Sequence, residues 1–149
     1  MERITYNNIP KGMFEHLRTI EEFTNNSTLS ISLLELIRLR ISQINKCAYC
    51  VDMHYKELKA MGETELRLST LCVWEETEIF TEKEKATLEF AELVTKVEKI
   101  PEILFEKLLS FYTKEEISIL TLSCTQINTW NRLMRTFEFK AGLYEVSNQ

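Results

Sequence analysis

The sequence predicts an all-α fold, and three observations support that prediction. Only three glycines and two prolines interrupt the 149 residues, which is too few for a turn-rich β fold. Leu, Glu, Lys and Ile are abundant, and this composition favours helices. Apolar residues recur every three or four positions along most of the chain. At this length a single domain, residues 1–149, buries about two thirds of its unfolded surface and needs neither a disulfide nor a metal to fold.

The apolar spacing predicts seven helices in order along the chain. They cover residues 11–23, 32–44, 48–60, 64–75, 82–97, 101–111 and 114–137. Thr81-x-x-Glu84 and Thr113-x-x-Glu116 match the capping box, in which two side chains bond the free amides at a helix start. They therefore predict where the fifth and seventh helices begin. Gly62 predicts the end of the third helix, because glycine adopts the left-handed conformation at little cost.

The second and third predicted helices are expected to form an antiparallel hairpin. The two residues between them, Asn45 and Lys46, are polar, and asparagine has weak helix propensity. If one helix ran straight through them, Glu35 and Cys47 would lie about 18 Å apart along its axis. If the chain reverses there, residues equally distant from the turn face each other, and Glu35 and His54 are such a pair. We therefore expect Glu35 within hydrogen-bonding reach of His54, directly or through one water.

Charge and hydropathy exclude several functional classes. The chain has 18 basic and 23 acidic residues, a net charge of −5, and no five-residue run of one sign, which argues against a nucleic-acid surface. No apolar run approaches the roughly 18 residues of a membrane span, and the segment MERITYNNIP lacks the apolar core of a signal peptide. We therefore expect a cytoplasmic protein that interacts with neither membrane nor nucleic acid.

The residues with the most distinctive chemistry are Cys47-x-x-Cys50-x-x-x-His54. Cytoplasmic thiols are kept reduced, so a close cysteine pair predicts metal binding or catalysis before it predicts a permanent disulfide. A structural zinc site usually needs four protein ligands, including a second close pair. The remaining cysteines, Cys72 and Cys124, stand alone in apolar helical stretches, where we expect buried small side chains. The sequence therefore predicts no metal site.

The spacing alone leaves open which sulfur is the nucleophile. Cys47 lies at the start of its predicted helix, where the amide dipoles favour a thiolate. Cys50 shares a helix face with His54, four residues later, which can accept its proton. Glu35 falls in line with these two across the hairpin, although Ser32-x-x-Glu35 also matches a capping box.

The full spacing, Glu35-x11-Cys47-x-x-Cys50-x-x-x-His54, resembles the core signature of the alkylhydroperoxidase D-like, carboxymuconolactone decarboxylase superfamily. The surrounding segments ELIRLRISQINKCAYCVDMH, VWEET, TEKEKATLEFAELVT and TLSCTQINTWNRL resemble its small single-domain members, over about residues 30–137. The resemblance implies an all-helical fold that assembles into homo-oligomers, commonly trimers or hexamers. It also implies that Cys50 reduces a hydroperoxide and Cys47 resolves the product as a disulfide. Glu35 and His54 would then form a proton relay.

One position departs from that pattern, because the archetypal alkylhydroperoxidase D has a histidine directly before the second cysteine and this chain has Tyr49. The decarboxylases that named the superfamily lack the cysteine pair, which disfavours a lactone decarboxylase. The leading hypothesis is a peroxiredoxin-type alkyl hydroperoxide reductase or disulfide oxidoreductase that uses no metal or organic cofactor. A lipoyl or thioredoxin-like dithiol would restore it. The alternative is a non-enzymatic helical protein whose cysteine pair senses redox state or binds a partner.

A weak internal repeat links two distant parts of the chain. LIRLRISQIN, residues 36–45, aligns with ILTLSCTQIN, residues 119–128, at an offset of 83. Ten residues do not establish a duplication, and similar packing demands on two helices produce the same pattern. At this offset the positions that match Glu35, Cys47, Cys50 and His54 are Ser118, Trp130, Leu133 and Phe137. The second segment therefore repeats the scaffold without the chemistry.

Overall fold

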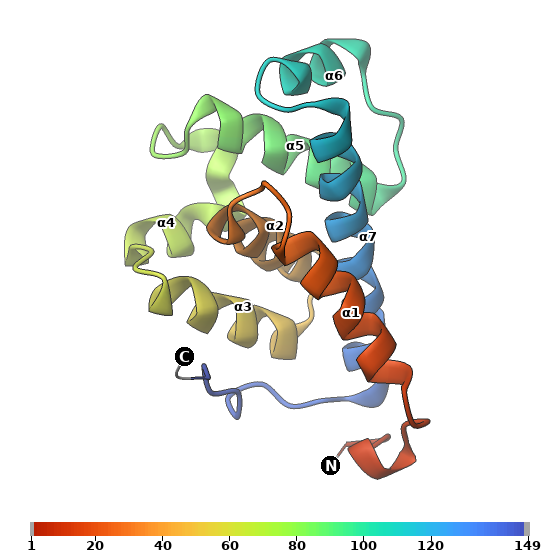
Figure 1. Cartoon of the computed structure of the whole chain (residues 1–149). Coiled ribbons are helices and arrows are strands. Elements are labelled where there is room, and N and C mark those ends of the chain that lie inside the picture. The colour runs from red at the N-terminus through yellow and green to blue at the C-terminus, as the bar shows by residue number, and fades with distance from the viewer. Residues whose placement is uncertain (1, 148–149) are drawn as a thin grey trace.

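The computed structural model describes residues 2–147 and contains helices and loops, with no strand in that range (Figure 1). In chain order the elements are η1 (Tyr6–Asn8), α1 (Met13–Asn25), α2 (Ile31–Ile44), α3 (Ala48–Ala60), α4 (Glu65–Thr70), η2 (Leu71–Glu76), α5 (Glu82–Lys96), α6 (Glu102–Leu109) and α7 (Lys114–Phe137). The predicted all-α fold is confirmed. Within residues 2–147, no helix combines the length and the apolar content needed to cross a membrane.

The predicted helix over residues 64–75 is wrong as a single regular element. α4 is followed directly by the 3₁₀ helix η2, and Val73 inside η2 has φ −128° and ψ 31°, outside the helical region. In a 3₁₀ helix every third residue shares a face, so Leu71 and Trp74 point into the core. The apolar spacing of three that predicted an α-helix here is produced by the tighter helix instead.

The predicted helix boundaries at three other places are confirmed. Thr81 with Glu84 and Thr113 with Glu116 both form complete capping boxes at the starts of α5 and α7. Gly62 follows the end of α3 with φ 90°, the left-handed conformation that glycine tolerates best. Local sequence therefore sets these boundaries.

The sequence allowed two roles for Glu35, one in a capping box at the start of α2 and one at the site, and the start of α2 excludes the first. Ser30 is the N-cap residue, and its hydroxyl accepts a hydrogen bond from the Leu33 amide at 3.3 Å. The capping box that pairs Ser32 with Glu35 is therefore wrong. The carboxylate of Glu35 is left available for contacts on another face of α2.

The helix α2 lies at the centre of the fold and contacts α3, α5 and α7. One apolar cluster fills the space between α2, α5, α6 and α7, and a second lies where α2 meets α3, η2 and α5. A third, smaller cluster joins the two cysteines of α3 to Phe14 of α1 and Met134 of α7. Each fully buried apolar side chain stabilises the fold by about 1.5–3 kcal/mol. The third cluster fixes the start of α3 between α1 and α7.

The C-terminal tail, residues 138–147, forms hydrogen bonds to the outer side of α3. It leaves the lower end of α7 and passes under α3 in Figure 1. The Gly142 amide donates to Asp52 Oδ2 at 2.9 Å, and Lys56 Nζ donates to the Tyr144 carbonyl at 2.8 Å. α3 is therefore held on one side by α2 and on another by the tail.

Candidate active site

The turn between α2 and α3 forms where the sequence predicts it. Asn45 closes α2 in the helical region, and Lys46 reverses the chain with φ 57°. The Asn45 side-chain amide donates to Asn128 Oδ1 and Asn131 Oδ1 of α7, both at 2.9 Å. These bonds hold the turn against α7 and set the register of the α2–α3 hairpin.

Glu35 and His54 face each other across this hairpin. Glu35 Oε2 lies 2.6 Å from His54 Nδ1, and each residue is 7% exposed, so the predicted contact is confirmed. Burial alone would raise the pKa of Glu35, but attraction to His54, its hydrogen bond and the nearby Arg38 lower the pKa to about 2. Glu35 is therefore a carboxylate at neutral pH. A carboxylate only accepts hydrogen bonds, so Nδ1 of His54 is the donor and Nε2 is the ring nitrogen left for other chemistry.

Cys47 and Cys50 form a disulfide at the start of α3. Their Cα atoms are 5.3 Å apart, within the range of about 4.4–6.8 Å that we expected for a pair able to form this bond. Cys47 is the N-cap residue, and its sulfur accepts a hydrogen bond from the Cys50 amide at 3.3 Å. The two residues are 1% and 2% exposed. The bond is reached only through a pocket or by a local opening of the surrounding side chains.

The two remaining cysteines have different environments. Cys124 is buried as predicted, and burial raises the pKa of its thiol to about 12. The prediction for Cys72 is wrong, because it is exposed. It follows Leu71 on η2, and the 3₁₀ geometry that turns Leu71 inward turns the next side chain outward.

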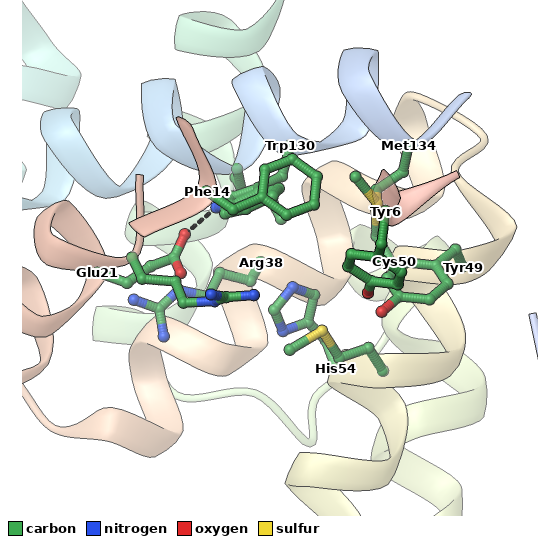
Figure 2. A pocket seen from close by; sticks show the side chains of 12 residues that line it. Tyr6, Phe14, Glu21, Arg38, Tyr49, Cys50, His54, Trp130 and Met134 are labelled. Atoms are coloured by element: carbon green, nitrogen blue, oxygen red, sulfur yellow. Dashed lines mark hydrogen bonds between the residues drawn. The ribbon is translucent and has the colours of Figure 1, made fainter. Parts of the chain in front are cut away.

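A pocket of about 120 Å³ lies over Cys50, between α1, α3 and α7 (Figure 2). Cys50 and His54 line the pocket and Cys47 does not. Most of the remaining wall is aromatic or methionine, for example Phe14 and Trp130. A small, largely apolar molecule placed there would meet Cys50 and the His54 ring together.

Tyr49 stands where the archetypal relatives have a histidine, and it also lines the pocket. Burial, followed by the proximity of Tyr6, raises the pKa of Tyr49 to about 12. The phenol therefore stays protonated at neutral pH and is no base there. Tyr49 therefore does not replace the histidine of the archetypal relatives as a base.

Three charged residues of the site, Arg18, Glu21 and Arg38, were missed by the sequence reasoning. Arg38 of α2 is 4% exposed, and its Nη1 donates to Glu35 Oε1 at 2.6 Å. Its position three residues after Glu35 was a usable signal, because side chains at that spacing share a helix face. Glu21 reaches the pocket from α1, where it accepts hydrogen bonds from Trp130 Nε1 and, at 3.4 Å, from Gln126 Nε2. No local pattern connects Glu21 to the cysteines, because α1 is brought to the site only by packing.

Burial raises the pKa of Glu21, and the hydrogen bond from Trp130 partly offsets that effect. The site thus holds two carboxyl groups in different environments, Glu35 paired with two donors and Glu21 at the pocket wall. Within residues 2–147, no group of three or more His, Cys, Asp or Glu side chains is arranged to hold a metal ion.

Comparison with known proteins assigns the chain to a family. The model of the Carboxymuconolactone decarboxylase family matches residues 11–93, more than half of the chain. The chain belongs to the carboxymuconolactone decarboxylase family. The match begins upstream of the cysteines and includes α1, which contributes to the pocket.

Three known proteins similar to this family member give a range of similarity. The uncharacterized protein YdfG of Bacillus subtilis (strain 168) is 37% identical over 135 residues, which cover 89% of this chain and 91% of YdfG. The crystal structure of ATU0492 from Agrobacterium tumefaciens, a protein of unknown function described as a candidate antioxidant defence protein AhpD, shares 35% identity with a TM-score of 0.90. That match covers 97% of this chain and 100% of ATU0492. The debrominase Bmp8 in complex with 2,3,4-tribromopyrrole shares 13% identity with a TM-score of 0.76, over 87% of this chain and 70% of Bmp8, and supports the fold alone.

Proposed function

We propose that this protein is a thiol-dependent peroxidase of the peroxiredoxin type, which reduces organic hydroperoxides through a Cys47/Cys50 dithiol–disulfide cycle. The observation that supports this most directly is the asymmetry of the pair. Cys50 lines the pocket beside His54, and Cys47 lies behind it at the helix start. A peroxide in the pocket therefore meets Cys50 first, next to a histidine whose other nitrogen is bonded to an ionised carboxylate.

In the first step the relay of His54 and Glu35 accepts the proton of the Cys50 thiol. The thiolate attacks the terminal oxygen of ROOH, the O–O bond breaks, and RO⁻ leaves with the bonding electron pair. The relay returns the proton to RO⁻, so the products are ROH and Cys50 sulfenic acid. In the second step the Cys47 thiol attacks the sulfenic sulfur, which releases water and forms the disulfide.

A dithiol of the cell then closes the cycle. It transfers two electrons and two protons to the disulfide, which restores both thiols and leaves the donor oxidised. Lipoyl groups and thioredoxin-like proteins have this chemistry and are present in the cytoplasm, where we place the protein. The proposed cycle requires no metal or organic cofactor bound to this protein.

The relatives support the proposal to different degrees. ATU0492, described as a candidate antioxidant defence protein, is similar over nearly the whole chain. The family name suggests a lactone decarboxylase, but the resemblance on which we rely assigns the cysteine pair to peroxidase members and not to those decarboxylases. Bmp8 is too distant in sequence to bring debromination to this chain.

A steady-state assay tests the proposal against a redox sensor. With tert-butyl hydroperoxide as substrate and dihydrolipoamide as reductant, we expect peroxide consumption to continue until one of the two is exhausted. A protein that only senses peroxide would consume one equivalent for each Cys47/Cys50 pair and then stop, which would contradict the proposal. The exposed Cys72 is replaced by serine in all samples so that its oxidation does not add to the count.

A second experiment assigns the two sulfurs. After one equivalent of peroxide, Cys50→Ser should show no sulfenic acid by mass spectrometry, and Cys47→Ser should retain sulfenic acid on Cys50 because no resolving thiol remains. Cys124→Ser is the matched control, since that thiol is buried away from the pocket. Sulfenic acid on Cys47 in the Cys50→Ser protein, formed at the wild-type rate, would reverse the assignment and show that the helix dipole selects the nucleophile.

The family resemblance also leads us to propose a homo-oligomer, either a trimer or a hexamer. Light scattering coupled to gel filtration measures the molar mass directly, and the chain mass of 17.6 kDa separates these two states from a monomer. A monomer at micromolar concentration would contradict this part of the proposal.

A further inference from the structure

Arg38 is a buried charged residue that the proposed reaction does not use directly. It is 4% exposed, and its Nη2 donates to Thr24 Oγ1 at 3.1 Å and to Asn25 Oδ1 at 2.8 Å, at the end of α1. Its Nη1 donates to Glu35 Oε1 at 2.6 Å. A buried guanidinium is strongly destabilising unless it is paired and hydrogen-bonded. These contacts satisfy it and tie the carboxylate of α2 to a different helix.

The consequence for Glu35 is that both of its oxygens are occupied. Oε1 accepts from Arg38, and Oε2 accepts from His54 Nδ1, each at 2.6 Å. A carboxylate held at both oxygens cannot rotate away from the imidazole. The ring of His54 is thereby fixed with its Nε2 edge directed away from Glu35. In Figure 2, Glu21, Arg38, His54 and Cys50 follow one another along the pocket.

Arg38 also balances the charge of Glu35. Without the guanidinium, an ionised carboxylate would face the His54 ring and the Cys50 thiol with no permanent cation beside it. In a buried site of low dielectric, that extra negative charge would make both groups hold their protons more strongly. With Arg38 present, the pair of Glu35 and Arg38 is neutral, so the thiol releases its proton at lower pH.

We infer that Arg38 is a positioning residue of the reactive site, which anchors Glu35 to α1 and cancels its charge so that Cys50 ionises near neutral pH. The inference rests on the proposed function only in taking Cys50 as the reactive sulfur. The other ionisable groups facing Cys50 and His54 are Arg18 and Glu21 from α1, Tyr6 from η1, Tyr49 and Glu57 from α3, and Tyr144 from the tail. α7 contributes the uncharged Ile127, Trp130 and Met134.

The test is the pH dependence of Cys50 alkylation in the reduced, full-length protein carrying Cys47→Ser. Iodoacetamide reacts with the thiolate, and peptide mass spectrometry reads Cys50 separately from the exposed Cys72. Arg38→Met should move the midpoint of the pH profile upward by about one unit, and from a midpoint near neutral pH this slows alkylation at pH 7 about fivefold. Arg38→Lys retains the charge but loses the planar fork, so its midpoint should move less.

A second variant, with the opposite effect on the local charge, distinguishes a charge effect from simple structural damage. Glu35→Gln leaves the positive charge of Arg38 unbalanced, so its midpoint should move downward, opposite to Arg38→Met. Damage to packing would change access of the reagent to the buried Cys50 by a similar factor at every pH, and it would not produce midpoint shifts of opposite sign. If Arg38→Met does not fold, the downward shift in Glu35→Gln still tests the charge balance, and an unchanged or raised midpoint there would overturn the inference.

Arg40→Met is the matched control for Arg38→Met. Arg40 lies on the same helix and forms an ion pair with Glu92 at 2.7 Å, away from the pocket. Its loss should leave the midpoint unchanged, and equal shifts in the two variants would overturn the inference. Alkylation needs no peroxide. The midpoints therefore test the role of Arg38 even if the steady-state assay shows no peroxidase activity. Midpoints that contradict the role of Arg38 leave the result of that assay unaffected.

Discussion

Residues 36–45 of α2 and 119–128 of α7 have similar sequences but different continuations. The two segments pack in the same core, and their last residues, Asn45 and Asn128, form a hydrogen bond of 2.9 Å with each other. After Asn45 the chain reverses at Lys46 and starts α3, whereas after Asn128 the helix α7 continues to Phe137. Only the first segment leads into the candidate active site.

The difference shows that the cysteine pair takes its place because α2 ends and a new helix, α3, begins. At Lys46 the left-handed backbone allows the Cys47 amide to bond the Ser42 carbonyl at 3.0 Å, and Cys47 becomes the cap of a new helix. A helix start presents free amides, one of which bonds the Cys47 sulfur. The position of α7 that matches Lys46 is Thr129, which lies inside the helix. Its hydroxyl donates to the Thr125 carbonyl, and the backbone amides there are already hydrogen-bonded within the helix. Four predictions test this contrast, from the largest expected effect to the smallest.

Glu35→Gln should destabilise the protein most, because it leaves the buried Arg38 without its carboxylate. We expect a loss of about 3–5 kcal/mol in the free energy of unfolding at pH 7. The folded-state pKa of Glu35 lies near 2, below its ordinary value of 4.5, so its contribution is present above pH 4.5 and is lost as the pH falls towards 2. The gap between wild type and Glu35→Gln, measured by urea unfolding, should therefore narrow as the pH falls below about 5. Ser118→Ala, at the matching position of α7, should follow the wild type, and a gap independent of pH would contradict the assignment.

His54→Ala should slow formation of Cys50 sulfenic acid about a hundredfold at pH 7, because the thiol loses its proton acceptor. The rate should partly recover at higher pH, where the thiol ionises unaided. Rapid-quench mass spectrometry with limiting peroxide measures this step alone. His16→Ala, which changes the other histidine of the chain at an exposed site on α1, should behave as wild type. A defect of equal size at every pH would contradict a role in proton transfer.

Asn45→Ala should remove the contact that joins the two similar segments. It deletes the donor to Asn128 and to Asn131, and Asn131 is fully buried. Leaving these acceptors without that donor should cost about 1–3 kcal/mol in the free energy of unfolding, measured in urea. Asn7→Ala, at an exposed position of η1, should cost nothing measurable. Equal effects in the two variants would show that the amide network does not hold the turn.

Lys46→Gly should have the smallest effect and the opposite sign. Glycine adopts the left-handed conformation of Lys46 without strain, so we expect a gain of about 0.5–1 kcal/mol in thermal or urea unfolding. Thr129→Gly at the matching position of α7 should instead cost a few tenths of a kcal/mol, because glycine weakens a helix interior. Two changes of the same sign would show that the backbone at these positions does not set the difference between the segments.

The sequence determined the helices and the main axis of the site, because both depend on short spacings. Periods of three and four predicted every α-helix of residues 2–147 except the kinked 64–75 segment, and the capping boxes predicted two helix starts. The short 3₁₀ helix η1 was not predicted. The turn at Asn45 and Lys46 and the contact between Glu35 and His54 followed from counting residues from one reversal point. Hydrogen bonding and side-chain direction within a helical hairpin are local enough for that count to succeed.

Only the tertiary structure decided what surrounds that axis. Phe14 and Glu21 reach the pocket from α1, far from the cysteines in sequence, and no spacing records which face of α1 turns towards α7. The spacing places Arg38 on the Glu35 face of α2, but its hydrogen bonds to Thr24 and Asn25 depend on where α1 packs. These placements depend on how remote helices share one core, since a buried charge is tolerated only where distant partners meet it. The sequence therefore determined that Glu35, His54 and Cys50 lie in a row. The packing of remote helices determined the pocket and the charged residues around them.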